Sequence, residues 1–323
     1  MMSAFRKIEL VTGEDLDARL LSFLTQRQMP DYFLYLGSTG AKRWLDLARS
    51  NEFPIATRLT ELLRANVHSL AHSLPRAIDV VSIGVGDGQK EKLLLKALKE
   101  RSEVRYFPVD ISSHMVDEAL EKAADLGVKM TGFVALFEDL PRLQQYWRPP
   151  VLLCMLGNNI CNYAPEELLS TVFRELEVGD YFLFDCHLFA PQPEEEEQWR
   201  EVFERAYHSD LNIRFNIGPL IDRGLRMEDC SFKLDLVKVD ALFGQTYRTE
   251  KFIEILRETS ITIGQSEVRL AAGDIIRMGF TYKYNASQVE GYLQHYNFHM
   301  KKRFFSEDGG NLLVLVQKVL MTD

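Results

Sequence analysis

The chain has 323 residues and the composition of an ordinary globular protein, with 46% hydrophobic and 26% charged residues. Its formal net charge of -9 disfavours nucleic acid as the main partner, because phosphate-binding proteins usually carry a basic patch. No window reaches the roughly 18 apolar residues of a membrane span, so we expect a cytoplasmic protein with no membrane partner. The length allows one large domain or two modest ones.

The four cysteines indicate neither a zinc site nor a disulfide framework. No two of them form a CxxC pair, and no histidine stands at a ligand spacing from them. We therefore predict buried, reduced thiols and no metal. The four residues are Cys154, Cys161, Cys186 and Cys230.

The first part of the chain has the spacing of amphipathic helices. Apolar residues recur at helical intervals over residues 15–74, with interruptions at Pro30, at Gly37 and Gly40, and at Pro54. This pattern predicts an α-helical front section.

Between residues 77 and 187, short apolar runs alternate with amphipathic segments. The runs read IDVVSIG, VRYFPVD, MTGFVAL, VLLCMLG and DYFLFDCHL, and the segments between them include KEKLLLKALKE, SHMVDEALEKAADL and PEELLSTVFREL. Continuous apolar strands that alternate with helices are typical of a parallel sheet covered on both faces. The pattern predicts a doubly wound α/β sheet.

After residue 190 a helical segment is followed by alternating strands, FKLDLVKVD, ITIGQSEVRLA and DIIRMGFTYKY, which predict an antiparallel sheet. The chain then gives one more helix and two strands joined by EDGG, typical of a hairpin at the edge of the α/β sheet. We predict an α/β domain over residues 76–189 and 285–323. The front section, residues 1–75, and the insertion, residues 190–284, are predicted to form a second, α+β domain.

A glycine turn follows the first apolar run of this sheet. Its glycines are Gly84, Gly86 and Gly88, and the third glycine of a dinucleotide-binding GxGxxG motif is replaced by Gln89. Ligands of open α/β sheets bind at the carboxyl ends of the strands. A GxGxG pattern there indicates a tight turn under a nucleoside and disfavours a nicotinamide dehydrogenase.

Two further features stand in order at the ends of the next strands. Asp110 ends the second run, where a carboxylate can accept hydrogen bonds from both ribose hydroxyls, and Phe137 and Glu138 follow the third run as candidate contacts for adenine. Together with the glycine turn, they predict S-adenosylmethionine as cofactor. One departure is Ser82, because class I methyltransferases usually carry an acidic residue two positions before the first glycine. Either Ser82 takes over that role or the cofactor site is weakened.

Short motifs in the same order resemble the histidine Nα-methyltransferases of ergothioneine biosynthesis over most of the chain. SIGVGDGQKEKLLL is similar to the family's ELGSGTSEKT followed by leucines, PVDIS to PVDVS, and LGNNICN to LGSTIGN. AYHSDLNIRFNIGPL resembles AYN followed by FN.N.L, and GDIIRMGFTYKY resembles GE.I.TE.S.KY. The front section, DYFLYLGSTGAKRWLDLARSNEFP, is similar as well. The resemblance implies a class I methyltransferase with a Rossmann-like sheet and a separate substrate domain.

The matching positions imply site residues. Lys90 falls on the family's lysine beside the glycine turn and is expected at the cofactor, as is Phe53 of the front section. Asn162 and Tyr207 are expected to orient the amine that receives the methyl group. The substrate-binding set is completed by Tyr35, Asn216, Gly279 and Thr281.

One side of the predicted pocket departs from the family. Gly279 stands where the family has a glutamate that helps to recognise the imidazole, and Thr281 stands where it has a serine. A site that hydrogen-bonds a group discriminates strongly by it. We therefore expect N-methylation of an amino acid or small amine other than histidine, with the glycine leaving room for a bulkier side chain.

Other functions stay open on the sequence alone. Transfer to oxygen or carbon needs no fixed motif, and a cofactor-binding but inactive partner protein would also fit Ser82 and the altered pocket. His187, at the end of a predicted strand, could be a catalytic base or a hydrogen-bonding residue. His114 is expected in the cap region of a helix.

Overall fold

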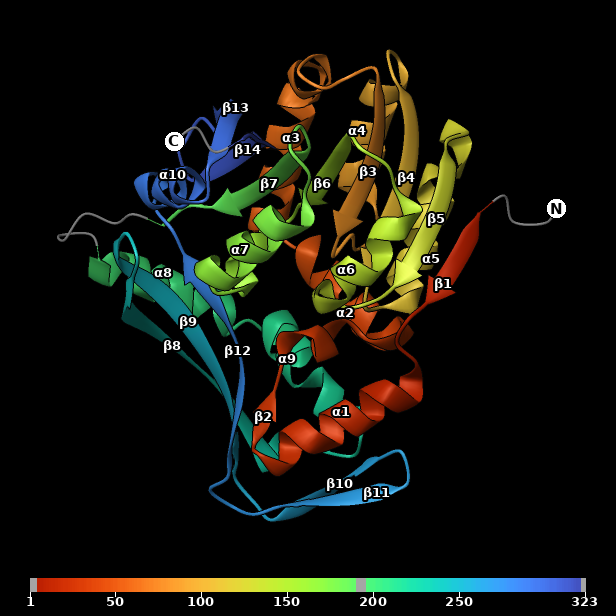
Figure 1. The fold of residues 1–323 in the computed structure, drawn as a ribbon. Helices are drawn as coiled ribbons and strands as arrows, with labels where there is room; N and C mark the ends of the chain where they lie inside the picture. Colours follow the sequence, from red (N-terminus) through yellow and green to blue (C-terminus); the bar gives the residue numbers. More distant parts are fainter. Residues whose placement is uncertain (1–4, 190–195, 321–323) are drawn as a thin grey trace.

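An eight-stranded sheet forms the larger part of the protein, whose computed structural model describes residues 5–189 and 196–320 (Figure 1). In sheet order its strands are β1 (Arg6–Glu9), β5 (Lys129–Val134), β4 (Glu103–Asp110), β3 (Ala77–Ile83), β6 (Val151–Met155), β7 (Tyr181–His187), β14 (Asn311–Lys318) and β13 (Phe298–Phe305). The strands from β1 to β7 pair in parallel, whereas β14 is antiparallel to both β7 and β13. The predicted sheet and its C-terminal hairpin are confirmed.

Helices cover both faces of this sheet, which explains why its strands are apolar throughout. On one face pack α3 (Ile55–His72), α4 (Gln89–Lys99) and α5 (Ser113–Ala123). On the other face pack α6 (Leu140–Leu143), α7 (Pro165–Glu175) and α10 (Ala286–His295). Every residue of β6 is buried. Within the described ranges, no helix is both long enough and apolar enough to cross a membrane.

A four-stranded sheet lies apart from the large one, in the lower left of Figure 1. Its order is β2 (Gln28–Met29), β12 (Ile275–Lys283), β9 (Gly244–Ile255) and β8 (Cys230–Ala241). The prediction missed β9. It was also wrong about ITIGQSEVRLA, which folds back at Gly264 into a separate hairpin of β10 (Thr259–Ile263) and β11 (Ser266–Leu270).

Helices from two distant parts of the chain pack with the smaller sheet around a common apolar core. They are α1 (Gly13–Thr25), the short 3₁₀ helix η1 (Asp31–Tyr35), α2 (Gly37–Ala48), α8 (Glu196–Tyr207) and α9 (Asp210–Ile221). The predicted interruption at Gly40 is wrong, since Gly40 lies inside α2. A Cβ there would stand 2.7 Å from the Leu34 carbonyl oxygen, so the glycine permits close packing of α2 on η1.

The front section is shared between the two sheets. β1 adds a parallel strand beside β5, and α3 packs against α4 and β14 in the core of the large sheet. The predicted assignment of residues 1–75 to the second domain is therefore wrong for these two elements. We propose that the second domain comprises residues 10–54 and the insertion up to residue 284. The predicted join at residue 190 lies outside the described residues.

Candidate active site

The glycine turn joins β3 to α4 at the carboxyl end of the sheet. Gly84, Gly86 and Gly88 all have left-handed backbone, with φ of 62°, 57° and 69°, a conformation that residues with a Cβ rarely adopt. A Cβ on Gly84 would stand 2.5 Å from Asn159 Nδ2, and one on Gly88 would stand 2.8 Å from Ala119 Cα. Gly86 has open space on the corresponding side. The turn thus leaves open space beside its middle glycine.

Asp110 lies at the end of β4 and holds the turn in place. Its carboxylate accepts a hydrogen bond from the Gly86 N–H (3.0 Å) and another from the Ser112 N–H (2.9 Å). Burial raises the pKa of Asp110, while the backbone donors of Ser112 and Gly86 oppose that rise. Each oxygen keeps lone pairs that can accept from a ribose hydroxyl. Together with the opening at Gly86, this arrangement fits a nucleoside.

Phe137 and Glu138 follow β5 in the short 3₁₀ helix η3 (Phe137–Asp139). The Phe137 ring is buried and lies 5.1 Å from the ring of Tyr163, centroid to centroid. Glu138 is exposed, and its charge adds to the rise in the Tyr163 pKa that burial causes. Asp110 raises the same pKa. Tyr163 is therefore a cofactor-site candidate that the motif comparison missed, although it directly follows Asn162.

Ser82 does not face the turn. It is fully buried, and its hydroxyl donates to Glu91 Oε1 of α4 at 2.8 Å. The family motif that this turn resembles has a glutamate at the position of Ser82 and a threonine at that of Glu91, so the carboxyl and hydroxyl residue types stand in the opposite order here. A carboxyl group therefore still lies next to Ser82 of β3, but α4 contributes it.

The buried Glu91 makes a specific stability prediction. Burial raises the pKa of Glu91 to about 7, so between pH 4.5 and pH 7 the folded protein retains a proton that the unfolded chain releases. The free energy of unfolding should therefore fall by about 3 kcal/mol across this window. Glu91→Gln, which cannot ionise but can still accept from Ser82, should lack this component. Urea unfolding of both proteins at pH 5 and pH 8 measures it. Glu118→Gln, at a half-exposed position of α5, is the control and should keep the wild-type pH dependence. An identical pH dependence in wild type and Glu91→Gln would contradict the prediction.

Lys90 points toward the loop after β6. Its Nζ lies 2.9 Å from the position that a Cβ on Gly157 would occupy. Asp185 of β7 accepts from the backbone N–H groups of Gly157 (2.6 Å) and Asn158 (2.7 Å), and Lys90 opposes the burial that raises the Asp185 pKa. Lys90 therefore lies between the glycine turn and this loop, and its cofactor contact stays a prediction.

Asn162 ends the short 3₁₀ helix η5 (Asn159–Asn162), which follows the same loop. Its Oδ1 accepts a hydrogen bond from Thr281 Oγ1 of β12 at 3.2 Å. This contact joins the large sheet to the smaller one. It also brings together two residues that the motif comparison placed in one site.

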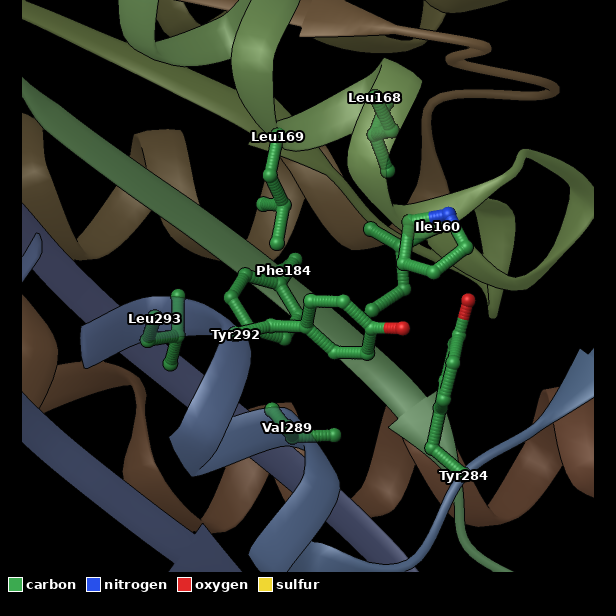
Figure 2. A pocket seen from close by; sticks show the side chains of 9 residues that line it. Ile160, Leu168, Leu169, Phe184, Tyr284, Val289, Tyr292 and Leu293 are labelled. Atoms are coloured by element: carbon green, nitrogen blue, oxygen red, sulfur yellow. The ribbon is translucent and has the colours of Figure 1, made fainter. Parts of the chain in front are cut away.

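A small apolar cavity of about 20 Å³ lies beneath η5 (Figure 2). It is lined by Ile160 of η5, by side chains of α7, β7 and α10, among them Tyr292, and by Tyr284, which lies between β12 and α10. The Tyr292 hydroxyl donates to Glu166 Oε1 at 2.9 Å. The cavity is too small for an amino acid, so we assign it to the core that supports η5.

Tyr207 ends α8 and lies among polar groups of the smaller sheet. Its side chain hydrogen-bonds to Thr249, and burial raises its pKa to about 12, so the hydroxyl stays protonated at neutral pH. The ammonium of Lys283 lies 5.8 Å from the centre of the Tyr207 ring. Burial lowers the pKa of Lys283 to about 8. Tyr207 is therefore suited to hydrogen bonding and not to proton abstraction.

An aromatic cluster carries Tyr35 and Phe53. The Tyr35 ring lies 5.5 Å from Trp44 and 5.4 Å from Phe215, and Phe53 packs against Trp44 at 6.0 Å. Burial raises the pKa of Tyr35, and the charges of Asp31 and Asp110 add to the rise. Tyr35 thus lies within electrostatic range of the Asp110 end of the site, whereas Phe53 lies behind Trp44.

Asn216 of α9 is buried next to this cluster. Its Nδ2 donates to the backbone oxygen of Asn212 at 2.9 Å, while its Oδ1 has no hydrogen-bond partner among the described residues. A buried amide oxygen without a partner is costly. This oxygen is therefore a candidate acceptor for a substrate N–H.

The expected room at Gly279 is absent. A Cβ on Gly279 would stand 2.7 Å from both carboxylate oxygens of Asp31, and the Gly279 N–H donates to Asp31 Oδ1 at 3.1 Å. Asp31 also pairs with the ammonium of Lys251. A carboxylate therefore does lie against Gly279, contributed by the front section, and the prediction of space for a bulkier group is wrong. Asp31 opens the aromatic motif of the front section, but that motif did not indicate a carboxylate at this site, and Lys251 stands in no motif.

The surroundings of His187 and His114 indicate structural roles. His187 Nδ1 lies 3.3 Å from Asn311 Oδ1, and burial lowers the pKa of His187 to about 4. The ring is neutral at physiological pH, which agrees with a hydrogen-bonding role at the strand end. Ser112 is the N-cap of α5, and His114 lies half-exposed in its first turn.

Two relatives are similar in sequence to most of the chain. It is 24% identical to the N-methyltransferase fsqC of Aspergillus fumigatus over 271 residues, which is 78% of this chain and 69% of that protein. It is also 24% identical to the N-methyltransferase imqF of Aspergillus flavus over 301 residues, 88% of this chain and 79% of that protein.

Solved structures show similarity at lower identity. A methyltransferase of Clostridium acetobutylicum that depends on S-adenosylmethionine is 12% identical, with a TM-score of 0.41 over 81% of this chain and 92% of that chain. The magnesium protoporphyrin IX methyltransferase of Synechocystis PCC 6803, solved with S-adenosylhomocysteine, is 12% identical, with a TM-score of 0.44 over 88% of this chain and 96% of that chain.

The family model for histidine-specific methyltransferases that depend on S-adenosylmethionine matches residues 15–318. This match spans both sheets and confirms the resemblance read from the motifs. It also confirms S-adenosylmethionine as the cofactor. The parallel sheet with helices on both faces agrees with the predicted class I methyltransferase fold. The chain belongs to the family of histidine-specific, S-adenosylmethionine-dependent methyltransferases.

Proposed function

We propose that this methyltransferase acts on the amine nitrogen of an amino acid or a related small molecule, and that its substrate is not histidine. Two relatives that are named N-methyltransferases support nitrogen as the acceptor. The observation that carries the proposal is the wall at Gly279, where the Asp31 carboxylate is already paired with Lys251.

The residues around η5 and α8 are suited to hold an amine. When bound, S-adenosylmethionine supplies a methyl group on a sulfonium, which departs as S-adenosylhomocysteine. The amine must be uncharged and held in line about 3 to 3.5 Å away, and an α-amine with a pKa of about 8 loses its proton readily. The amide of Asn162 and the hydroxyl of Tyr207 would orient the amine, and Asn216 Oδ1 would accept a hydrogen bond from one of its N–H groups. The nearby charge of Lys283 disfavours the protonated form.

The ion pair between Asp31 and Lys251 affects how well the site could bind histidine. A free carboxylate gives an imidazole N–H a charge-assisted hydrogen bond. Here the ammonium offsets much of that charge, so an imidazole gains less than it would beside an unpaired glutamate. This difference favours other amino acids over histidine.

A substrate panel tests the proposal. The purified protein with S-adenosylmethionine should form S-adenosylhomocysteine with at least one amino acid, and kcat/KM for histidine should be at least tenfold lower than for the best substrate. Mass spectrometry of the product locates the methyl group. Turnover of histidine alone, or methylation at oxygen or carbon only, would overturn the proposal.

A further inference from the structure

A bulge in β12 lies where Asp31 of η1 packs against Gly279. Two residues of β12, Met278 and Gly279, stand opposite the single residue Lys251 of β9, between the regular pairs of Arg277 and Phe280. Bulges re-aim side chains and occur often beside active sites. Met278 also pairs with Met29 of β2. The chain leaves β2 at this point, and Asp31 follows two residues later.

Glycine at position 279 is a condition for this arrangement. The main chain of Gly279 donates to Asp31 Oδ1, and any Cβ would overlap both carboxylate oxygens. Asp31 is 15% exposed and Lys251 7% exposed. Removing such charges from water costs free energy that their attraction scarcely recovers, so a buried ion pair is a weak device for stability. A role in recognition explains it better.

The surroundings of the pair are those of the proposed amine site. Lys251 lowers the pKa of Tyr207 and Asp31 raises it, while Asp31 also raises the pKa of Tyr35, so both hydroxyls lie within electrostatic range of the pair. Gly279 stands two residues before Thr281, whose hydroxyl donates to Asn162. Tyr35 lies in the same short helix η1 as Asp31, and its ring packs against those of Trp44 and Phe215.

We propose that the Asp31–Lys251 pair reads the side chain of the amino acid substrate and selects an uncharged one. The inference rests on the proposed function. Lys251 would repel a cationic side chain, and Asp31 would repel an anionic one. In each case the charge of opposite sign is already paired and cannot offset the repulsion. An uncharged group with a hydroxyl or amide can donate to Asp31 and accept from Lys251, because each keeps free hydrogen-bonding capacity.

Two single variants should shift this selection in opposite directions. Asp31→Asn keeps an acceptor for the Gly279 N–H and leaves Lys251 unpaired, so kcat/KM for glutamate relative to tyrosine should rise at least tenfold. Lys251→Met keeps the length of the side chain and leaves Asp31 unpaired. We therefore expect kcat/KM for lysine and for histidine, each relative to tyrosine, to rise at least tenfold. The double variant should restore the preference for an uncharged side chain.

Binding provides a readout without turnover. Each amino acid is titrated calorimetrically into the full-length protein saturated with S-adenosylhomocysteine, and the order of affinities should follow the same reversal. The exposed pair Lys42–Asp46, joined at 2.7 Å on α2, supplies the matched controls Lys42→Met and Asp46→Asn, which should change nothing. Titration with S-adenosylhomocysteine alone verifies that every variant is folded, and the double variant stays informative if one single variant fails to fold.

The results separate two failures. If the wild type methylates uncharged and charged amino acids equally well, or if folded single variants keep the wild-type order, the pair does not read the side chain and this inference is overturned. If the wild type neither binds nor methylates any amino acid but does methylate another class of molecule, the proposed function is overturned as well.

Discussion

Asp110→Asn should weaken the binding of both S-adenosylmethionine and S-adenosylhomocysteine about 100-fold. The carboxylate is predicted to accept from both ribose hydroxyls, and hydrogen bonds to a charged group contribute about 1.5 to 3 kcal/mol each. An asparagine keeps one acceptor oxygen for the Gly86 N–H, which Asp110 holds at 3.0 Å. The loss of about 3 kcal/mol should therefore come mainly from the ligand contacts.

Calorimetric titration with both ligands measures this effect. Asp117→Asn is the matched control, because Asp117 is a half-exposed carboxylate of α5 that pairs with Lys7 of β1. Unchanged affinity in Asp110→Asn would mean that the carboxylate only fixes the glycine turn. A lower melting temperature without ligand would show that turn function separately.

Asn162→Ala should lower kcat/KM for methyl transfer about 100-fold and leave cofactor affinity unchanged within about twofold. The amide is predicted to align the amine, and a poorly aligned nucleophile loses rate steeply. Asn162 is anchored through Thr281 Oγ1, which donates to it at 3.2 Å. Steady-state kinetics with the best substrate of the panel measure the change.

Thr281→Val separates alignment from anchoring. This variant removes the hydroxyl but leaves the Asn162 amide, so we expect a loss of about tenfold. If both variants lose activity equally, the amide acts only through Thr281. If Asn162→Ala keeps full activity, Asn162 has no part in catalysis.

The large sheet could be predicted from local patterns because its strands are apolar over their whole length and alternate with helices. The order of Gly84, Asp110 and Glu138 at successive strand ends was also visible, since a parallel sheet brings carboxyl ends together. In β9 polar and charged residues interrupt the apolar ones, as in TYRTEKFIEI, and this strand was missed.

The contact between Asp31 and Gly279 could not be predicted from local patterns. The approach of Asp31 to Gly279 depends on a bulge and on the parallel pairing of a two-residue strand, β2, and neither leaves a periodic signal. The same holds for Glu91, whose place behind Ser82 depends on how α4 packs on the sheet. In each case a motif showed which side chain had been lost, and only the fold showed which residue replaced its chemistry.

The contact between Asp31 and Gly279 joins residues 248 positions apart in the chain. During synthesis the glycine turn and Asp110 are complete long before position 279 leaves the ribosome. Contacts of such separation form late in folding, because the intervening chain must be ordered first. A nascent chain should therefore be able to form the Asp110–Gly86 contact before Asp31 can reach Gly279, whereas the large sheet is completed only when β13 and β14 have followed.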